Sequence, residues 1–199
     1  MLAANHVPAT FFEIGEQVTA TYAGTLRLSL RDGDALGNHT WSHPFLPGAR
    51  DLASQLQRTD AAISNATGYT PCLFRPPYGA SNRSIVATAR SFAMATILWN
   101  VDPFDWRRPG VGAIEQRVLA ELQPGAIIET HDGGGDRSQT LAAYPYVIDA
   151  IRQRGYRFVT VPQLLGFHTL YRECTGAGCR GEGVHGPLPK GSIVEPGPR

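Results

Sequence analysis

Short apolar segments alternate with helical patterns along most of the chain. Strands are expected at residues 9–14, 35–38, 71–74, 94–99, 126–130 and 156–161. Between them, apolar residues spaced three or four positions apart predict helices over residues 51–67, 81–90, 114–122 and 141–151. Because strands alternate with helices, the pattern predicts an α/β fold with a mostly parallel sheet, either open and doubly wound or closed into a barrel.

The pattern weakens toward the carboxyl end, where Gly and Pro accumulate. We therefore expect one domain over residues 1–167 and a tail over residues 168–199 that is mostly loop or disordered. Within the tail, four residues separate Cys174 from Cys179, which leaves open a small disulfide loop or two separate thiols. Cys72 ends an apolar stretch and is predicted to be a small buried side chain.

Composition narrows the classes of function. The 199 residues are 42% hydrophobic and 18% charged, which is typical of a globular protein with a core rather than of a disordered chain. Eighteen basic and 17 acidic residues give a net charge of +1, so the chain does not have the charge of a nucleic-acid-binding protein. No apolar run is long enough to cross a membrane, and the first residues do not resemble a secretory signal.

Polar side chains follow several of the predicted strands. His39 and Arg75 each come directly after a strand, Asp102 and Asp105 follow the next, and His131 follows the fifth. Both barrels and open α/β sheets build their sites at the carboxyl ends of parallel strands. The sequence therefore predicts a functional site made of these residues.

His39 and His43 are candidate metal ligands. Imidazoles four residues apart can converge on one ion, and neutral histidines suit zinc, cobalt or nickel. A catalytic zinc ion usually has a third protein ligand, for which a carboxylate is expected. The alternative is a hydrogen-bonded pair of surface histidines.

The segment from Arg75 through Pro77 and Tyr78 to Gly79 is a rigid, proline-rich turn. The two prolines fix their own φ angles, which makes the turn rigid and holds the Tyr78 amide in one direction. In that direction it could donate to an oxyanion. Arg75 could hold a carboxylate in a bidentate pair. The alternative is a structural turn with a surface arginine.

Two acidic residues and two tryptophans lie within residues 99–106. Trp99 and Trp106 beside Asp102 and Asp105 suit a sugar site, because an aromatic face packs on a pyranose ring. His131 ends an apolar strand and could act as a general acid near neutral pH. The alternatives are a loop held by buried tryptophans and a histidine that caps backbone groups.

Taken together, these motifs resemble the NodB-type polysaccharide deacetylases of carbohydrate esterase family 4. The matching segments are His39-Thr40-Trp41-Ser42-His43, Arg75-Pro76-Pro77-Tyr78-Gly79, Asp102-Pro103-Phe104-Asp105-Trp106 and Ile128-Glu129-Thr130-His131-Asp132. The resemblance covers about residues 1–167 and implies a distorted (β/α) barrel. It also implies a hydrolase that removes N-acetyl, or sometimes O-acetyl, groups from an acetylated polysaccharide such as peptidoglycan or a chitin-like glycan.

The resemblance implies a role for each motif. His39 and His43 would hold a divalent metal, most often zinc, with cobalt or nickel as alternatives, and a metal-bound water would attack the acetyl carbonyl. The Tyr78 amide would stabilise the oxyanion, and Arg75 would position the catalytic base. His131 would protonate the leaving amine, with its pKa tuned by Asp105. The residues expected along the substrate groove are Trp106, Tyr78, Trp99 and Pro77.

The sequence departs from the family at its first motif, Thr-Phe-Asp-Asp-Gly, which would supply the base and the third metal ligand. No two adjacent aspartates occur in the chain. We therefore expect a barrel without its first strand and an essentially inactive chain, either an N-terminally truncated piece of a longer enzyme or a decayed homologue. The longer protein would be extracellular or face the cell wall. The alternative is a non-catalytic carbohydrate-binding remnant; a nucleotide-binding fold would require a phosphate loop that the sequence lacks.

Overall fold

A computed structural model describes residues 1–166, 171–175 and 178–180. The described chain divides into two compact units. The sheet unit contains residues 8–98 with 160–166, 171–175 and 178–180, and the α4–α5 unit contains residues 1–7 with 99–159. In the described residues, no helix is long and apolar enough to cross a membrane.

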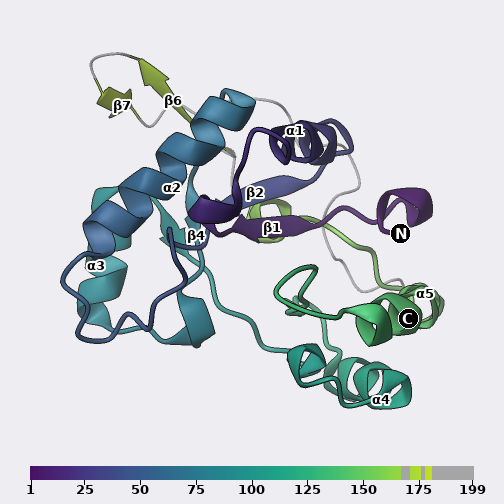
Figure 1. The fold of residues 1–199 in the computed structure, drawn as a ribbon. Helices are drawn as coiled ribbons and strands as arrows, with labels where there is room; N and C mark the ends of the chain where they lie inside the picture. The colour runs from purple at the N-terminus through teal and green to yellow at the C-terminus, as the bar shows by residue number, and fades with distance from the viewer. Residues whose placement is uncertain (167–170, 176–177, 181–199) are drawn as a thin grey trace. The chain divides into compact units, whose positions relative to one another are not determined.

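The sheet unit is built on four parallel strands (Figure 1). In spatial order they are β1 (Thr10–Glu13), β2 (Ala35–Asn38), β4 (Leu73–Phe74) and β5 (Ala95–Thr96). Three longer helices connect them, namely α1 (Ala23–Arg31), α2 (Leu52–Thr67) and α3 (Arg83–Ser91). Short 3₁₀ turns follow β1 and β4, namely η2 (Gly15–Gln17) and η3 (Pro77–Gly79).

Strand β2 lies inside this sheet, and all four of its residues are buried. Gly37 allows the close approach of β1, because a Cβ atom at that position would lie 2.4 Å from the Phe12 ring. A larger residue at 37 would therefore have to displace the Phe12 ring.

The helices cover the sheet with two apolar clusters. One contains Leu46, Leu52, Leu56, Phe74, Ile85, Ala89 and Met94, and the other contains Leu26, Leu36 and Ile63. The ends of the helices follow ordinary capping rules: Gly68 ends α2 with φ 84°, and the Asn82 side chain accepts from the Ile85 amide at the start of α3.

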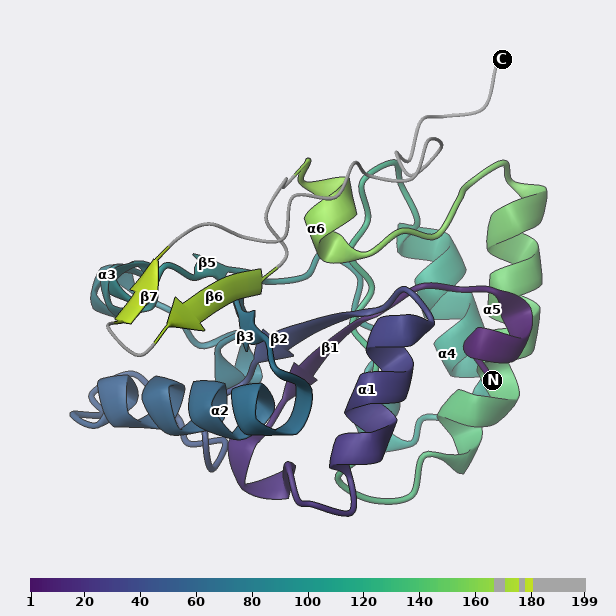
Figure 2. The same ribbon diagram turned by 90° about the horizontal axis from the view of Figure 1, so that it is seen from above.

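A second, antiparallel sheet joins β3 (Thr70–Pro71), β6 (Tyr171–Thr175) and β7 (Gly178–Arg180), as Figure 2 shows from above. Strands β6 and β7 lie in the part expected to be mostly loop or disordered, where no strand was predicted. Strand β6 pairs antiparallel with β3 on one side and with β7 on the other. The register places Cys174 opposite Cys179, but their side chains and the rest of the tail lie outside the described residues.

The α4–α5 unit consists mainly of α4 (Val111–Glu121) and α5 (Ser138–Gln153). Their shared core contains Val101, Ile114, Val118, Ala143, Tyr144, Val147 and Ile151. Two 3₁₀ turns, η1 (Ala3–Asn5) and η4 (Asp105–Arg107), complete the unit. Instead of a strand over residues 126–130, the described chain has one parallel bridge between Val101 and Ile128.

Two further expectations differ from the structure. Residues 156–161 do not form a strand; they lead into the helix α6 (Val161–Leu164), because Thr160 and Gln163 form a capping box that favours a helix start. Helix α1 was not expected, although Ala23 and Leu26 bury one of its faces. The α/β class with a parallel sheet is confirmed, whereas closure into a barrel stays a prediction.

Candidate active site

In the sheet unit, His39 and Arg75 lie side by side at the carboxyl ends of neighbouring strands. Asn38 pairs with Phe74 in the β2–β4 register, and the Arg75 amide donates to the Asn38 carbonyl at 3.0 Å. The next residue along each strand is therefore presented at one edge of the sheet. This confirms that the two motifs meet, as the alternation of strands and helices predicts.

The imidazole of His39 is held in one tautomer. Its Nδ1 lies 2.6 Å from the Arg75 carbonyl oxygen, which can only accept, so Nδ1 carries a proton. In the neutral ring, Nε2 is then the atom that keeps its lone pair. The Nε2 atoms of His39 and His43 are 3.1 Å apart, and the two rings meet edge to face. A backbone carbonyl that fixes a metal-binding histidine in this way is the usual arrangement around metal ligands.

The loop that carries the two histidines is fixed by buried amide side chains. Asn38 accepts from the Thr40 amide at 2.9 Å and donates to Asp60 Oδ1 and to the Leu56 carbonyl, both at 2.9 Å. Gln55 accepts from the backbone N–H groups of Trp41 and Ser42 at 2.9 and 3.0 Å. Residues on β2 and α2 thus hold the loop that presents His39 and His43.

The pair suits a divalent metal but does not complete a ligand set. Two imidazoles on one tetrahedral zinc ion, each with a Zn–N distance of about 2.0–2.1 Å, have nitrogens about 3.3 Å apart, close to the separation seen here. Among the described residues, no group of three His, Cys, Asp or Glu side chains could hold a metal ion. The expected third, carboxylate ligand is thus not found in this part of the chain.

The turn after β4 presents Tyr78 beside the histidines. Tyr78 is in the left-handed region with φ 60°, and its exposed ring contacts the His43 ring edge to face, with centroids 4.7 Å apart. Its hydroxyl lies 3.4 Å from the His43 carbonyl. Pro77 is buried beneath the turn, and the buried Arg75 guanidinium stacks 4.3 Å over the Phe12 ring.

In the α4–α5 unit, Asp105 and His131 form a second polar cluster. The His131 Nδ1 lies 2.7 Å from Asp105 Oδ1, and the His131 amide donates to Oδ2 at 3.0 Å. Thr140, on α5, donates its hydroxyl to the same Oδ2 at 2.9 Å. Asp105 is almost completely buried, while the His131 side chain is 36% exposed.

The proximity of these two groups shifts both of their pKa values. For Asp105, burial opposes ionisation, but the hydrogen bonds from His131 outweigh it and lower the pKa of the carboxyl below 3.8. For His131, the hydrogen bond to Asp105 outweighs burial and raises the pKa of the imidazole above 6.5. The pair therefore favours a charged, exposed imidazolium near neutral pH.

The other predicted site residues of this unit are Trp99, Asp102 and Trp106. Trp106 is exposed and stacks against the Arg107 guanidinium at 4.6 Å, and Trp99 is partly buried. Asp102 accepts from the Phe104 amide at 2.7 Å, as a turn residue does. Their roles toward a substrate stay predictions.

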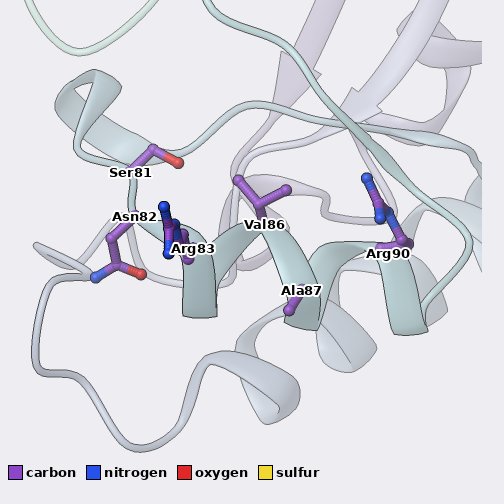
Figure 3. A pocket seen from close by; sticks show the side chains of 6 residues that line it. All are labelled: Ser81, Asn82, Arg83, Val86, Ala87 and Arg90. Atoms are coloured by element: carbon purple, nitrogen blue, oxygen red, sulfur yellow. The ribbon is translucent and has the colours of Figure 1, made fainter.

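A separate cavity of about 350 Å³ lies along α3 in the sheet unit. Figure 3 shows its lining side chains, Ser81, Asn82, Arg83, Val86, Ala87 and Arg90. None of the predicted site residues and no metal-binding type of side chain lines it. The candidate chemistry therefore lies at the strand ends rather than in this cavity.

Four residues that shape these clusters were not singled out from the sequence. Asn38, Gln55 and Thr140 act through contacts 18–22, 13–14 and 35 positions away in the chain, so no local pattern reveals them. Phe45 carries a local signal, because it follows His43 in a proline-containing loop.

The fold and both clusters define a class of protein. The model of the polysaccharide deacetylase family matches residues 1–97, and relatives that are more than 30% identical extend the match over most of the chain. The chain belongs to the polysaccharide deacetylase family.

Two curated relatives illustrate this membership. The chain is 36% identical over 178 residues to a chitooligosaccharide deacetylase from Bradyrhizobium, covering 82% of this chain and 81% of the relative. It is 37% identical over 162 residues to a peptidoglycan-N-acetylglucosamine deacetylase from Bacillus cereus, covering 80% of this chain and 76% of the relative.

A solved structure supports the fold and adds a functional contrast. A pseudoenzyme of carbohydrate esterase family 4 from Bacillus anthracis superposes with a TM-score of 0.76 at 32% identity. The match covers 83% of this chain and 58% of that one. Family membership therefore does not by itself establish activity.

Proposed function

We propose that this chain carries the chemistry of a metal-dependent deacetylase that hydrolyses N-acetyl groups of a polysaccharide such as peptidoglycan or a chitin-like glycan. The observation that carries the proposal is the His39 tautomer, fixed by the Arg75 carbonyl, which leaves the Nε2 lone pair facing His43. The names of the two curated relatives support this class of substrate.

His39 and His43 are the residues that would hold the metal. Zinc, or alternatively cobalt or nickel, suits two neutral imidazoles. When bound, such an ion polarises an acetyl carbonyl and makes a water molecule more acidic. The chain's contribution at this point is orientation, because Asn38 and Gln55 fix the loop before any ion arrives.

His131 is the proposed general acid. Its Nδ1 proton is engaged by Asp105, so the Nε2 proton is the one available for transfer. Hydrolysis of an N-acetyl group breaks the bond between the carbonyl carbon and nitrogen, and the departing nitrogen must gain a proton. Because the pKa of His131 is raised, a larger fraction of the imidazole holds this proton near neutral pH than in a free histidine.

The Tyr78 amide is the proposed donor to the developing oxyanion, and Arg75 the residue that positions the base. The substrate contacts proposed from the resemblance are Trp106, Tyr78, Trp99 and Pro77. Of these, Tyr78 and Trp106 have exposed rings, whereas Pro77 supports the turn from below. We assign the histidine pair and the Asp105–His131 pair to one reaction.

A second candidate function is a non-catalytic carbohydrate-binding protein. The observation that favours it is that no adjacent aspartates occur in the 199 residues, together with the pseudoenzyme relative. A general base contributes about 10²–10⁴-fold to such reactions. We therefore expect this chain by itself to release acetate very slowly, and we propose an extracellular or wall-facing location for the protein because its proposed substrates lie there.

The test is acetate release from chitooligosaccharides and from peptidoglycan with added zinc or cobalt. It compares the chain with a version extended by an upstream strand carrying Thr-Phe-Asp-Asp-Gly. The proposal is supported if the extended protein releases acetate, if its His131→Ala variant does not, and if its His6→Ala variant still does. His6 is the matched control because it is also an exposed histidine. Non-additive losses in the His39→Ala/His131→Ala double variant support a shared reaction.

Other outcomes contradict parts of the proposal. Glycan binding without acetate release by either protein favours the non-catalytic function. Full activity of the unextended chain contradicts the need for the missing aspartates. Equal activity of His131→Ala and His6→Ala in the extended protein overturns the assignment of the general acid.

A further inference from the structure

The loop after the histidine pair exposes a phenylalanine beside Tyr78. The Phe45 side chain is 63% exposed and that of Tyr78 is 64% exposed. Their ring centroids are 6.3 Å apart, with the rings tilted by 45°. Single exposed apolar residues are ordinary, but two neighbouring exposed rings beside a candidate metal-binding pair form a distinct surface.

The position of Phe45 is set by its neighbours. Leu46, the next residue, is 2% exposed and packs with Leu52, Leu56 and Phe74 in the core of the sheet unit. The Ala49 amide donates to the Leu46 carbonyl at 2.8 Å and closes the turn. The loop is thus anchored inside the protein while Phe45 is left at the surface.

The Tyr78 ring is also held in place. It packs edge to face on His43, with its hydroxyl 3.4 Å from the His43 carbonyl. Aromatic side chains ordered in this way lose little conformational freedom when a ligand packs on them.

We propose that Phe45, together with Tyr78, forms an aromatic platform for a neutral pyranose ring of the glycan, next to the sugar whose acetyl group is presented to His39 and His43. This inference rests on the proposed function and adds Phe45 as a substrate-positioning residue. The surface suits an uncharged sugar, because an aromatic face packs on the apolar C–H face of a pyranose. The Tyr78 ring contacts the His43 ring with centroids 4.7 Å apart, so a sugar bound at the platform places its neighbour beside the histidine pair.

The experiment measures binding of N-acetylated chitooligosaccharides, from the monosaccharide to the tetrasaccharide, to the full chain by calorimetry without added metal. Phe45→Ala should weaken tetrasaccharide binding about three- to tenfold and monosaccharide binding less. Phe45→Trp should keep or strengthen it. Tyr146→Ala is the control, because Tyr146 is a similarly exposed aromatic residue, 58% exposed, on α5.

Zinc affinity and the melting temperature of Phe45→Ala should match those of the parent chain, which separates the platform from the metal pair and from folding. If Phe45→Ala weakens glycan binding but no protein form releases acetate, the platform stands and the catalytic proposal falls. If Phe45→Ala binds the tetrasaccharide as the parent does, or if it changes only self-association in sedimentation, the platform is overturned. The platform is also overturned if Phe45→Ala and Tyr146→Ala weaken tetrasaccharide binding equally.

Discussion

Replacing Asp105 by Asn tests how the Asp105–His131 pair works. The buried carboxylate accepts from the His131 ring, the His131 amide and the Thr140 hydroxyl. An asparagine keeps one acceptor oxygen and turns an NH₂ group toward the remaining donors, so the His131 amide or ring loses its acceptor. A hydrogen bond to a charged group contributes about 1.5–3 kcal/mol; because the His131 side chain is 36% exposed, solvent screening reduces this, and we expect a loss of about 2 kcal/mol.

The loss should depend on pH in a defined direction. The pKa of Asp105 is lowered in the folded chain, so its contribution is present above about pH 3.8 and is lost as the pH falls through the folded value. The pKa of His131 is raised, so its contribution is present below about pH 6.5 and is lost as the pH rises through the folded value. The destabilisation by Asp105→Asn should therefore be largest between these two limits.

Two measurements check this reasoning. Urea unfolding across the pH range gives the change in the free energy of unfolding, and an NMR titration of the His131 ring should show a lower pKa in Asp105→Asn than in the parent. Asp136→Asn is the matched control, because Asp136 pairs with Arg108 at 2.7 Å on the surface and both side chains are half exposed. A pKa of His131 that does not change, or a destabilisation that is independent of pH, would refute the coupling.

Four further outcomes follow from single contacts. His39→Ala should abolish zinc binding in a chelator competition assay, since one imidazole remains; zinc bound as in the parent would show that the pair is not the site. Thr140→Val should raise the pKa of Asp105 in NMR titrations, because the Thr140 hydroxyl donates to its carboxylate and stabilises the charged form. Thr140→Ser should retain the low pKa, and equal values in both variants would exclude Thr140 as a positioning residue. Asn82→Ala should lower the free energy of unfolding by about 1 kcal/mol, because α3 loses its cap. Leu56→Ala should lower it by about 2–5 kcal/mol, because a cavity is left in the core. Urea unfolding measures both, and unchanged midpoints would contradict these assignments.

The sequence is most informative where local chemistry decides the structure. Strand β2 has the predicted bounds, Ala35–Asn38, and the ends of α2 and α3 follow the predicted Gly68 and Asn82 caps. The strand expected at residues 156–161 does not form, because the capping box of Thr160 and Gln163 starts a helix among these β-branched residues.

The candidate site shows a similar division. The sequence motifs predicted His39, Arg75, Asp105 and His131 as site residues. The structure places His39 against the Arg75 carbonyl and Asp105 against His131. The supporting contacts of Asn38 and Thr140 depend on how helices pack on neighbouring segments, which no local pattern specifies. Proline-rich spacing suggested a rigid turn at Tyr78, but the left-handed backbone there is visible only in the structure.

Three site positions adopt backbone geometry that favours glycine. Thr40, His43 and Tyr78 have φ values of 70°, 55° and 60°, and each such residue with a Cβ atom costs about 1 kcal/mol or more relative to ordinary backbone. Glycine would remove this cost at His43 and Tyr78, whereas the buried Thr40 hydroxyl accepts from the His43 amide at 3.1 Å and holds the loop. A chain that no longer used the site would therefore gain stability from glycine at His43 and Tyr78, but not from loss of the buried Asn38 and Gln55. These two strained positions are where relatives that have changed function should diverge first.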